Sequence, residues 1–421
     1  MPSRRDFLYG ASAGTLLALG LPIIGAARAN PLSTGKRKFI FVFNGGGWDP
    51  TRVFAAEYAN NNVDMELDSD LATIGNIRFA DHPARPSVRS FFTGFHDRTL
   101  VVNGMMVRSI AHEICTLIAL TGTTASGAPD WPAILASSER ESYILPHLVL
   151  DGPSFPGDLG VAVARTGANG QLEALLSGQA LEWSDNGAYG PNSPAENIMD
   201  RYLVRRTAAR ADAARSAVDL RLTSDFHRGL QQAQRLKDMQ YILDLSTGAD
   251  LGSQSAVACE ALSMGVSRCV TMAFGGGGWD THANNDDDQS PLWETLFSGL
   301  NQLMNLLEST PGEVEATLAE ETVVVVLSEM GRTPQLNDLN GKDHWPFTSA
   351  MLVGQGITGD RVIGSFDDNY YGRPVDTLTG EVDEGGQTLS AESLGATLLA
   401  LADIDPGEFV SGVEPIYGVL E

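Results

Sequence analysis

Two glycine-rich segments of the chain end in the same Trp-Asp pair. Residues 45–49 have the sequence Gly-Gly-Gly-Trp-Asp, and residues 275–280 have the sequence Gly-Gly-Gly-Gly-Trp-Asp. Each segment directly follows a short apolar run. Glycine allows the backbone to approach a ligand closely, and Asp49 and Asp280 could bind a cation. Aspartate and glycine are also common in turns, so a purely structural role is the alternative.

Other residue types that bind metals accompany these aspartates. His282 lies two residues after Asp280, and in an extended segment this spacing places both side chains on one side. A third apolar run leads into Glu329, and Asp343-His344 follows after a glycine-containing loop. A mixture of aspartate, glutamate and histidine suits zinc, manganese or iron, whereas calcium and magnesium prefer oxygen ligands alone. The predicted metal ligands are Asp49, Asp280, His282, Glu329, Asp343 and His344.

The apolar runs before these residues are predicted to be buried strands that alternate with helices. Strands are predicted at 38–43, 268–274 and 321–327, weaker strands at 100–102 and 144–150, and helices at 254–264 and 292–307. This alternation predicts an α/β fold with a largely parallel sheet. Ligands bind beyond the carboxyl ends of the strands in such sheets. The acids should therefore meet at one edge, where their mutual repulsion favours a bound cation.

Two further segments differ from this pattern. Residues 194–245 are rich in Ala, Arg, Leu, Gln and Asp and contain almost no Gly or Pro. We predict two or three helices there, forming a cap or insertion. The acidic run at residues 286–288 is expected to be a solvated loop rather than a site.

Arg332 and His112 are candidates for direct roles in chemistry. Arg332 lies just after the strand predicted at 321–327, where its guanidinium could hold a phosphate or sulfate through two parallel hydrogen bonds. An ion pair with one of the acids is the alternative. His112 could be a metal ligand, a general base or a core histidine.

The charge of the chain excludes some partners. It has 53 acidic and 28 basic residues and a net charge of −25, which disfavours binding to nucleic acid and to anionic lipid head groups. Three cysteines do not form a disulfide framework. Cys115 is expected to be a buried thiol, and a bridge between Cys259 and Cys269 is conceivable.

The first 29 residues have the layout of a twin-arginine export signal. Arg4-Arg5 precedes Phe7-Leu8, an apolar stretch continues to about residue 26, and Ala27-Arg28-Ala29 is typical of a cleavage site. A membrane anchor is the alternative, which the glycines and Pro22 of the stretch disfavour. We therefore expect a signal peptide at 1–29, export through the twin-arginine translocase and a periplasmic or extracellular mature chain of 30–421. No later segment reaches the ~18 apolar residues of a membrane span.

With these residues in view, the chain resembles the family known as domain of unknown function 1501, whose members are similar to the alkaline phosphatase and sulfatase superfamily. The resemblance covers nearly the whole mature chain. It rests on the first strand with Asp49, on 278–282 (Gly-Trp-Asp-Thr-His), on 328–333 (Ser-Glu-Met-Gly-Arg-Thr) and on Asp343-His344. It implies an alkaline-phosphatase-like, three-layer α/β fold. It also implies that Asp49, Asp280, His282, Glu329 and His344 hold one or two metal ions, with zinc favoured.

Two positions depart from the superfamily pattern. Glu329-Met330 stands where Asp-His or Asp-Asn is usual, so a second metal would lack one of its ligands here. Ala111-His112 stands where the family tends to have Ser-His, at the position of the superfamily's nucleophile. Ser109, Thr116 and Cys115 are the nearby hydroxyls and thiol, and we take Ser109 together with His112 and Arg332 as the catalytic candidates.

The sequence thus predicts an exported, metal-dependent hydrolase of the alkaline phosphatase and sulfatase type. Its substrate would be a small phosphate or sulfate ester, and it would have no nucleic-acid partner and no stable membrane span after cleavage. The rival prediction is a non-catalytic surface or assembly protein that keeps the fold with a degenerate site. Ala111 and Met330 favour the rival, whereas 280–282 and Asp343-His344 favour the enzyme.

Overall fold

The computed structural model describes residues 36–166, 172, 193–239, 245 and 247–421. The predicted signal peptide at 1–29 lies outside the described residues. Among the described helices, none has the length and apolar character to cross a membrane.

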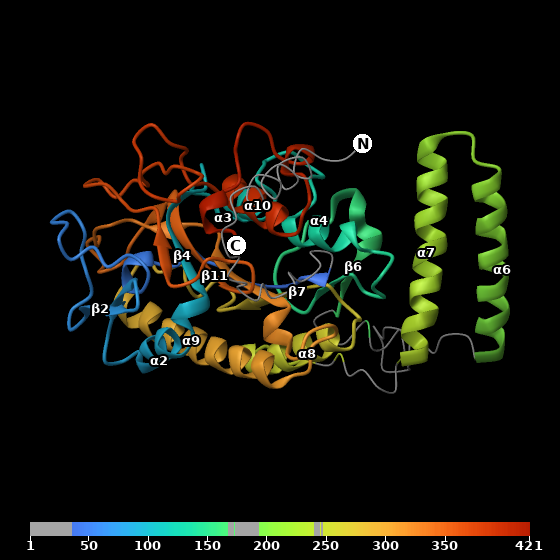
Figure 1. The fold of residues 1–421 in the computed structure, drawn as a ribbon, viewed down its shortest axis with the longest axis horizontal. Coiled ribbons are helices and arrows are strands. Elements are labelled where there is room, and N and C mark those ends of the chain that lie inside the picture. Colours follow the sequence, from blue (N-terminus) through green and yellow to red (C-terminus); the bar gives the residue numbers. More distant parts are fainter. Residues whose placement is uncertain (1–35, 167–171, 173–192, 240–244, 246) are drawn as a thin grey trace, which may run out of the picture. The chain divides into compact units, whose positions relative to one another are not determined.

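A central eight-stranded sheet organises the chain (Figure 1). Its strand order is β12-β4-β11-β8-β1-β7-β5-β6, and β11 runs antiparallel to both of its neighbours while the other pairs are parallel. The strands are β1 Lys38–Asn44, β4 Thr99–Met106, β5 His147–Val149, β6 Val163–Arg165, β7 Cys269–Phe274, β8 Thr322–Ser328, β11 Phe347–Gly354 and β12 Arg361–Ile363. The predicted α/β fold with a largely parallel sheet is confirmed.

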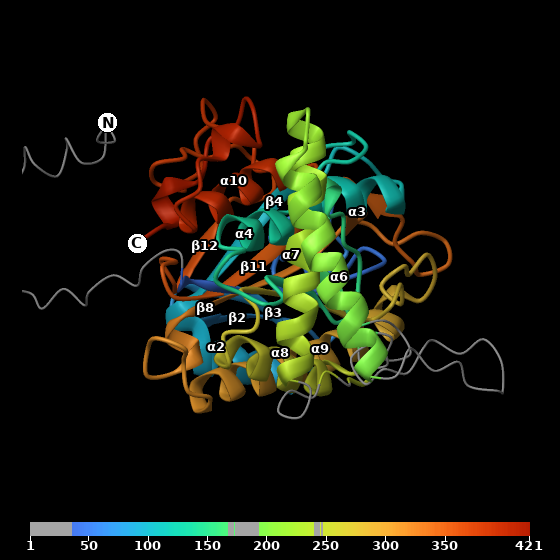
Figure 2. The same ribbon diagram turned by 90° about the vertical axis from the view of Figure 1, so that its right-hand side faces the viewer.

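Helices cover both faces of this sheet (Figure 2). One face packs against α2 Pro86–Phe95, α8 Leu251–Ser263 and α9 Asn285–Ser309, and the other against α3 His112–Thr121, α4 Trp131–Ser138 and α10 Ala391–Leu401. Side chains alternate between the faces of a strand. In β1, Ile40 and Val42 therefore enter one core while Phe39, Phe41 and Phe43 enter the other. This burial on both sides explains why the strand is a continuous apolar run.

Shorter elements complete the fold. Two small antiparallel pairs are β2 Asp70–Ile74 with β3 Ile77–Asp81, and β9 Gly331–Arg332 with β10 His344–Trp345. The 3-10 helices are η2 Pro50–Arg52, η3 His96–Arg98, η4 Gly157–Ala162, η5 Leu318–Glu320, η6 Pro406–Glu408 and η7 Tyr417–Val419.

Two long helices, α6 Ser193–Asp212 and α7 Ala217–Met239, occupy most of the segment for which helices were predicted. They pack against each other as a hairpin, and α7 also contacts η4. Arg228 of α7 forms an ion pair with Glu141. Whether the hairpin acts as a cap over the site stays a prediction.

One expectation about local structure is corrected, and one alternative left open by the sequence is excluded. The acidic run at 286–288 is not a solvated loop, because it forms the first turn of α9, where carboxylates interact favourably with the helix dipole. Cys259 and Cys269 do not form a bridge, and both are buried free thiols.

The tryptophans of the two Trp-Asp pairs anchor their loops in one core. Trp48 stacks on Trp293 of α9 with ring centroids 5.0 Å apart, and Trp279 meets the same ring edge-on at 4.9 Å. All three indoles are fully buried. The repeated sequence therefore attaches two glycine loops to one helix.

Candidate metal centre

Three strands end at the same level of the sheet. Asn44, the last residue of β1, is in register with Phe274 at the end of β7 and with Ser328 at the end of β8. Because these strands are parallel, the loops that follow them leave the same edge. The loop after β4 and the short strand β10 reach this edge as well, and they contribute His112 and His344.

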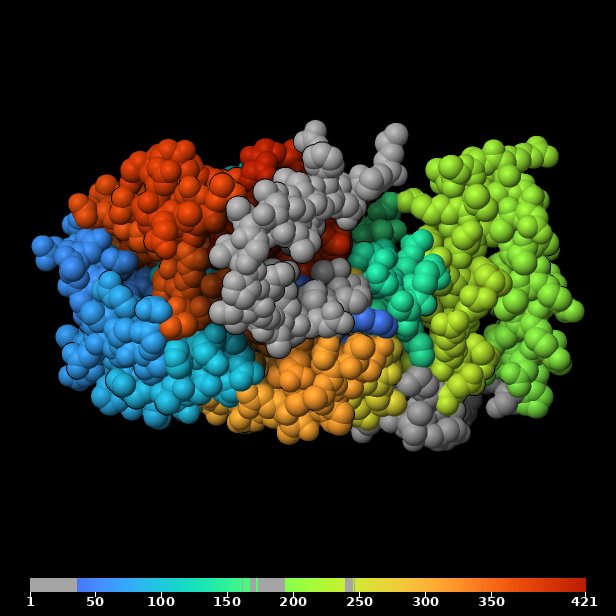
Figure 3. Space-filling view, viewed as in Figure 1, coloured from blue at the N-terminus to red at the C-terminus, as the bar shows by residue number. Residues whose placement is uncertain are grey.

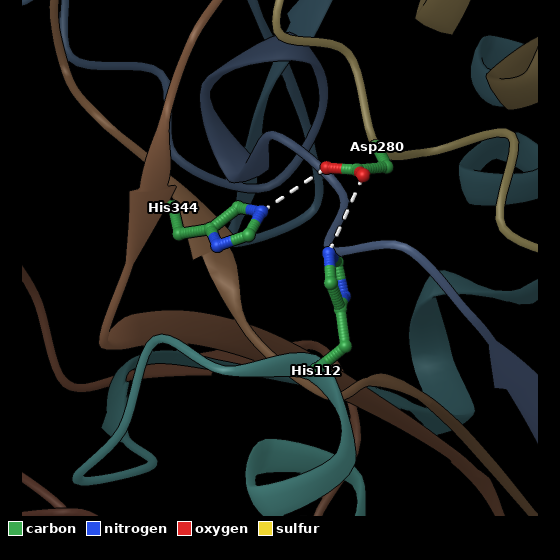
Figure 4. Close-up of side chains that lie close together, drawn as sticks. All are labelled: His112, Asp280 and His344. Carbon is green, nitrogen blue, oxygen red and sulfur yellow. Dashed lines mark hydrogen bonds and ion pairs between the residues drawn. The ribbon is translucent and has the colours of Figure 1, made fainter.

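Asp280 lies at the centre of the resulting cluster (Figure 4). Its Oδ1 atom is 3.1 Å from Nε2 of His282 and 3.1 Å from Nε2 of His344, and its Oδ2 atom is 3.4 Å from Nε2 of His112. Ligand atoms of His112, Asp280 and His344 all lie within 4.8 Å of one another. Among the predicted metal ligands, the structure brings Asp280, His282 and His344 together, and it adds His112.

The other ring nitrogen of each histidine contacts an acceptor oxygen. Nδ1 of His344 donates to the carbonyl of Ile110 at 2.7 Å, and Nδ1 of His282 donates to Asp343 at 2.8 Å. Nδ1 of His112 donates to Glu329 at 3.0 Å. In each ring the proton therefore sits on Nδ1, and the neutral imidazole presents a lone pair at Nε2. Acceptors that hold metal-binding histidines in this way are usual at metal sites.

Three lone pairs and a carboxylate thus face one another. Nε2 of His112 is buried and has no hydrogen-bond partner among the described residues. Such an arrangement is unfavourable unless extra protons or a cation lie between the groups. Two ligand atoms about 2.1 Å from a tetrahedral zinc ion lie about 3.4 Å from each other, close to the spacings around Asp280. The donor set therefore fits a divalent metal.

Asp280 is ionised under ordinary conditions. Partial burial raises the pKa of this carboxyl, but the hydrogen bond from Arg332 and the positive charge of that guanidinium outweigh it and lower the pKa to about 2. A permanent carboxylate at the centre of three imidazoles is a suitable anionic ligand.

Glu329 and Asp343 contact the histidines rather than Asp280. Glu329 is almost fully buried, and its Oε1 atom also accepts a hydrogen bond from the backbone N–H of Gly46 at 2.6 Å. Gly46 has a φ of +117°, and a Cβ atom there would lie 2.7 Å from the backbone nitrogen of Asp280. Glycine is therefore required where the two glycine loops touch.

Asp49 lies in a different network, beneath the loops. It is fully buried and forms ion pairs with Lys342 at 2.8 Å and Arg52 at 3.4 Å. It also accepts hydrogen bonds from Thr51 and from Asn285. Burial raises its pKa, but the charges of Lys342 and Arg52 and the hydrogen bonds from Lys342 and Thr51 lower it to about 2. The two Trp-Asp aspartates thus have different surroundings.

Arg332 is fully buried, and its guanidinium is occupied. Its Nε donates to the carbonyl of Gly47 at 2.7 Å, its Nη1 to that of Lys342 at 3.1 Å, and its Nη2 to that of Gly46 and to Asp280. Of the two roles considered for Arg332, the structure shows the ion pair with an acid, and that acid is Asp280. Arg332 ties the first glycine loop to the carboxylate of Asp280.

At the start of α3, the residue before His112 is Ala111 and not the serine found in related sequences, so it offers no nucleophile. Ala111 is the N-cap residue and makes no side-chain cap. Ser109 Oγ accepts a hydrogen bond from the backbone N–H of Ala111 at 3.2 Å. Cys115 is buried, and burial raises the pKa of its thiol to about 11, so the thiol stays protonated at neutral pH. Thr116 belongs to the same helix.

Some groups that contact the cluster could not be identified from the sequence. The carbonyl of Ile110 and the N–H of Gly46 are backbone groups, which every residue carries. Lys342 was not singled out, although its N–H donates to the carbonyl of Thr281 and its side chain binds Asp49. The position of Lys342 directly before Asp343-His344 is the sequence feature that could have indicated its role.

A family model described as "Protein of unknown function (DUF1501)" matches residues 36–414. No curated protein matches the chain. A putative sulfatase from Bacteroides thetaiotaomicron is similar in structure at 11% identity and a TM-score of 0.36, over 92% of this chain and 75% of that one.

Two other solved structures are similar to a comparable degree. An alkaline phosphatase superfamily protein from Vibrio parahaemolyticus has 9% identity and a TM-score of 0.37, over 92% of this chain and 70% of that one. Phosphonate monoester hydrolase SpPMH from Silicibacter pomeroyi has 12% identity and a TM-score of 0.36, over 91% and 77%. At these scores the similarity transfers no activity to this chain.

Proposed function

This chain belongs to the DUF1501 family, and we propose that it is an exported, metal-dependent hydrolase of phosphate or sulfate esters. The observation that carries the proposal is the convergence of three imidazole Nε2 atoms on Asp280, while each Nδ1 atom is held by an acceptor. The ester class comes from the sequence motifs at 278–282, 328–333 and 343–344. Export rests on the twin-arginine motif.

We assign His112, Asp280 and His344 as the ligands, with His282 as the fourth donor beside them. Mixed nitrogen and oxygen donors favour zinc, with manganese and iron as alternatives. A bound metal of this kind polarises an ester oxygen and lowers the pKa of a coordinated water. Asp49 stays outside this ligand set because Lys342 and Arg52 already surround it.

The other residues orient the ligands. Glu329 and Asp343 hold the rings of His112 and His282 in the tautomer that leaves Nε2 free. We assign Arg332 to positioning Asp280 rather than to binding the ester, since its donors are occupied. The positive charge that attracts an anionic ester must then come from the metal.

A second candidate function is metal binding without catalysis. Ala111 carries no hydroxyl at the N-cap of α3, and the thiol of Cys115 is buried. The candidate nucleophiles of a hydrolase with this site are then a water molecule and the hydroxyl of Ser109. A protein that binds metal but turns over no ester would therefore fit this candidate.

One experiment separates the two candidates. The full chain is purified without added metal, its metal content is measured by mass spectrometry, and aryl phosphate, phosphonate and sulfate esters are tested with zinc, manganese or iron added. We expect about one metal ion per chain and hydrolysis that chelation abolishes. The His112→Ala variant should lose both. Bound metal without turnover of any ester would favour the non-catalytic candidate, and absence of metal binding would contradict both.

A further inference from the structure

The α6–α7 hairpin carries the opposite charge to the rest of the chain. Residues 193–239 contain nine basic and six acidic residues, a net charge of +3, so the remainder of the chain carries −28. The excess lies at one end of the hairpin. Residues 205–222, which include the turn between the helices, hold five arginines and two aspartates. We call residues 205–222 the hairpin tip.

Most arginines of the hairpin tip have no partner among the residues that the structure describes. Arg221 forms an ion pair with Asp158. The other four are exposed and make no ion pair or side-chain hydrogen bond with any described residue, although carboxylates are abundant in this chain. They are Arg205, Arg206, Arg210 and Arg215. Arg201, Arg205 and Arg235 also line a cavity of about 530 Å³ between the two helices, which extends the basic surface along the hairpin.

Large apolar side chains are exposed beside these arginines. Val218, Leu222 and Phe226 follow one another at four-residue spacing on α7, with 58%, 59% and 53% of their surface exposed. Leu220 is 49% exposed. Residues four apart share one face of a helix, so the first three form an apolar stripe. In the view of Figure 3, no other described segment lies over the outer side of α6.

We propose that the hairpin tip binds the surface of an anionic phospholipid bilayer. Phosphate head groups would pair with the four free arginines, while the apolar stripe enters the boundary of the acyl chains. Exposed arginines next to an apolar helix face are typical of helices that lie in a membrane interface. The tip would attach the molecule to the surface without spanning the bilayer.

Charge complementarity distinguishes this occupant from a second copy of the chain. Pairing two hairpins face to face would bring eight unpaired arginines together, which like-charge repulsion disfavours. A bilayer presents a continuous surface of negative charge to these arginines. The strongly negative remainder of the molecule is repelled by the same plane, but salt screens charges beyond about 8 Å. The negative net charge of the whole chain disfavours binding to anionic lipid, but it does not reflect the local positive charge of the hairpin tip.

The test is co-sedimentation of the full chain with vesicles of phosphatidylglycerol and phosphatidylcholine, or of phosphatidylcholine alone. The tip variant combines Arg205→Gln, Arg206→Gln, Arg210→Gln and Arg215→Gln. A control variant combines Arg78→Gln, Arg89→Gln, Arg98→Gln and Arg373→Gln, which changes the net charge equally at sites away from the hairpin. A third variant carries Val218→Ser and Leu222→Ser. All share the N-terminal apolar stretch, so its own lipid binding cancels in the comparison.

We expect the unmodified chain and the control variant to bind anionic vesicles at least tenfold more tightly than the tip variant. Binding should weaken as salt is raised, and the serine variant should bind more weakly than the unmodified chain. Circular dichroism melting checks that each variant is folded. Equal binding by the tip and control variants, or equal binding to uncharged vesicles, would overturn the proposal. So would a lipid-free dimer in light scattering that the tip variant alone loses, because the occupant would then be a second copy.

Discussion

The Nε2 atoms of His282 and His344 lie 3.0 Å apart, although the hydrogen bonds at Nδ1 leave neither with a proton in the neutral state. Both atoms are also 3.1 Å from the same oxygen of Asp280. Two lone pairs and a carboxylate at such distances repel one another. The arrangement becomes favourable when these atoms share a bound cation. The predictions about metal binding rest on this distance.

Removing one of these imidazoles should reduce metal binding. We expect His344→Ala to lower the zinc content of the purified chain to a small fraction of the unmodified value, since it deletes a ligand and a neighbour of Asp280. Zinc at a hundredfold excess over its Kd should stabilise the unmodified chain by about 2.7 kcal/mol, and chelation should lower the Tm accordingly. His227→Ala, on α7 and outside the site, serves as the control. Equal zinc content in both variants would contradict the site.

The sheet could be predicted from the sequence because its strands are buried on both faces. The run Lys38–Asn44 is almost wholly apolar, and such runs between glycines and helices are a direct consequence of a covered parallel sheet. The weaker strand at 144–150 proved shorter, His147–Val149. The charged run at 286–288 was mistaken for a loop because acidic residues favour both exposed loops and the first turn of a helix.

The site was less predictable, because the same short motif occurs in two environments. Gly-Trp-Asp follows the end of two strands, with Asp49 and Asp280 as its last residue, and both tryptophans pack on Trp293. Only the fold places Lys342 beside Asp49 and the three histidines beside Asp280. Spacing along the chain identified the edge of the sheet at which the aspartates lie. It could not show which aspartate pairs with a basic side chain and which one is placed to bind a metal.

Export can be tested without knowledge of the activity. Changing Arg4 and Arg5 to Lys should leave the precursor in the cytoplasm, because the twin-arginine pathway depends on the paired arginines. Cell fractionation with an antibody against the chain measures this. Arg108→Lys, outside the N-terminal segment, is the control. Normal export of the double variant would refute the assignment.

A hydroxyl at position 111 tests whether the site needs a nucleophile from the chain. Ala111 has extended backbone angles and caps α3 without a side-chain bond, so Ala111→Ser should stabilise the fold by about 0.5 to 2 kcal/mol. It also places a hydroxyl directly before His112. We expect ester hydrolysis to rise if a serine nucleophile is what the site lacks, whereas unchanged hydrolysis would indicate attack by water. Ala111→Gly is the control without a hydroxyl.

The ion pairs of Asp49 should make stability depend on pH. The pKa of this carboxyl is about 2 in the folded chain and has its ordinary value of 3.8 when unfolded. A lowered pKa means that the stabilisation, about 2 to 3 kcal/mol, is present above pH 4 and is lost as the pH falls toward 2. Urea unfolding across this range should show the loss in the unmodified chain. Asp49→Asn should lack this component, and an identical pH dependence in both chains would contradict it.

Asp49→Asn and Asp280→Asn should have opposite effects on stability and metal binding. Asp49→Asn leaves Lys342 buried without its carboxylate, although Arg52 keeps its ion pair with Asp286, and this loss should cost about 3 to 5 kcal/mol of unfolding free energy. The folded variant should still bind zinc, because Asp49 is not among the groups around the histidines. Asp280→Asn keeps an oxygen for Arg332 and should destabilise the metal-free chain less, while most of the zinc is lost. Denaturant unfolding and zinc titration measure both quantities. Loss of zinc at unchanged stability in Asp49→Asn would instead make Asp49 a ligand, as its position after β1 predicted.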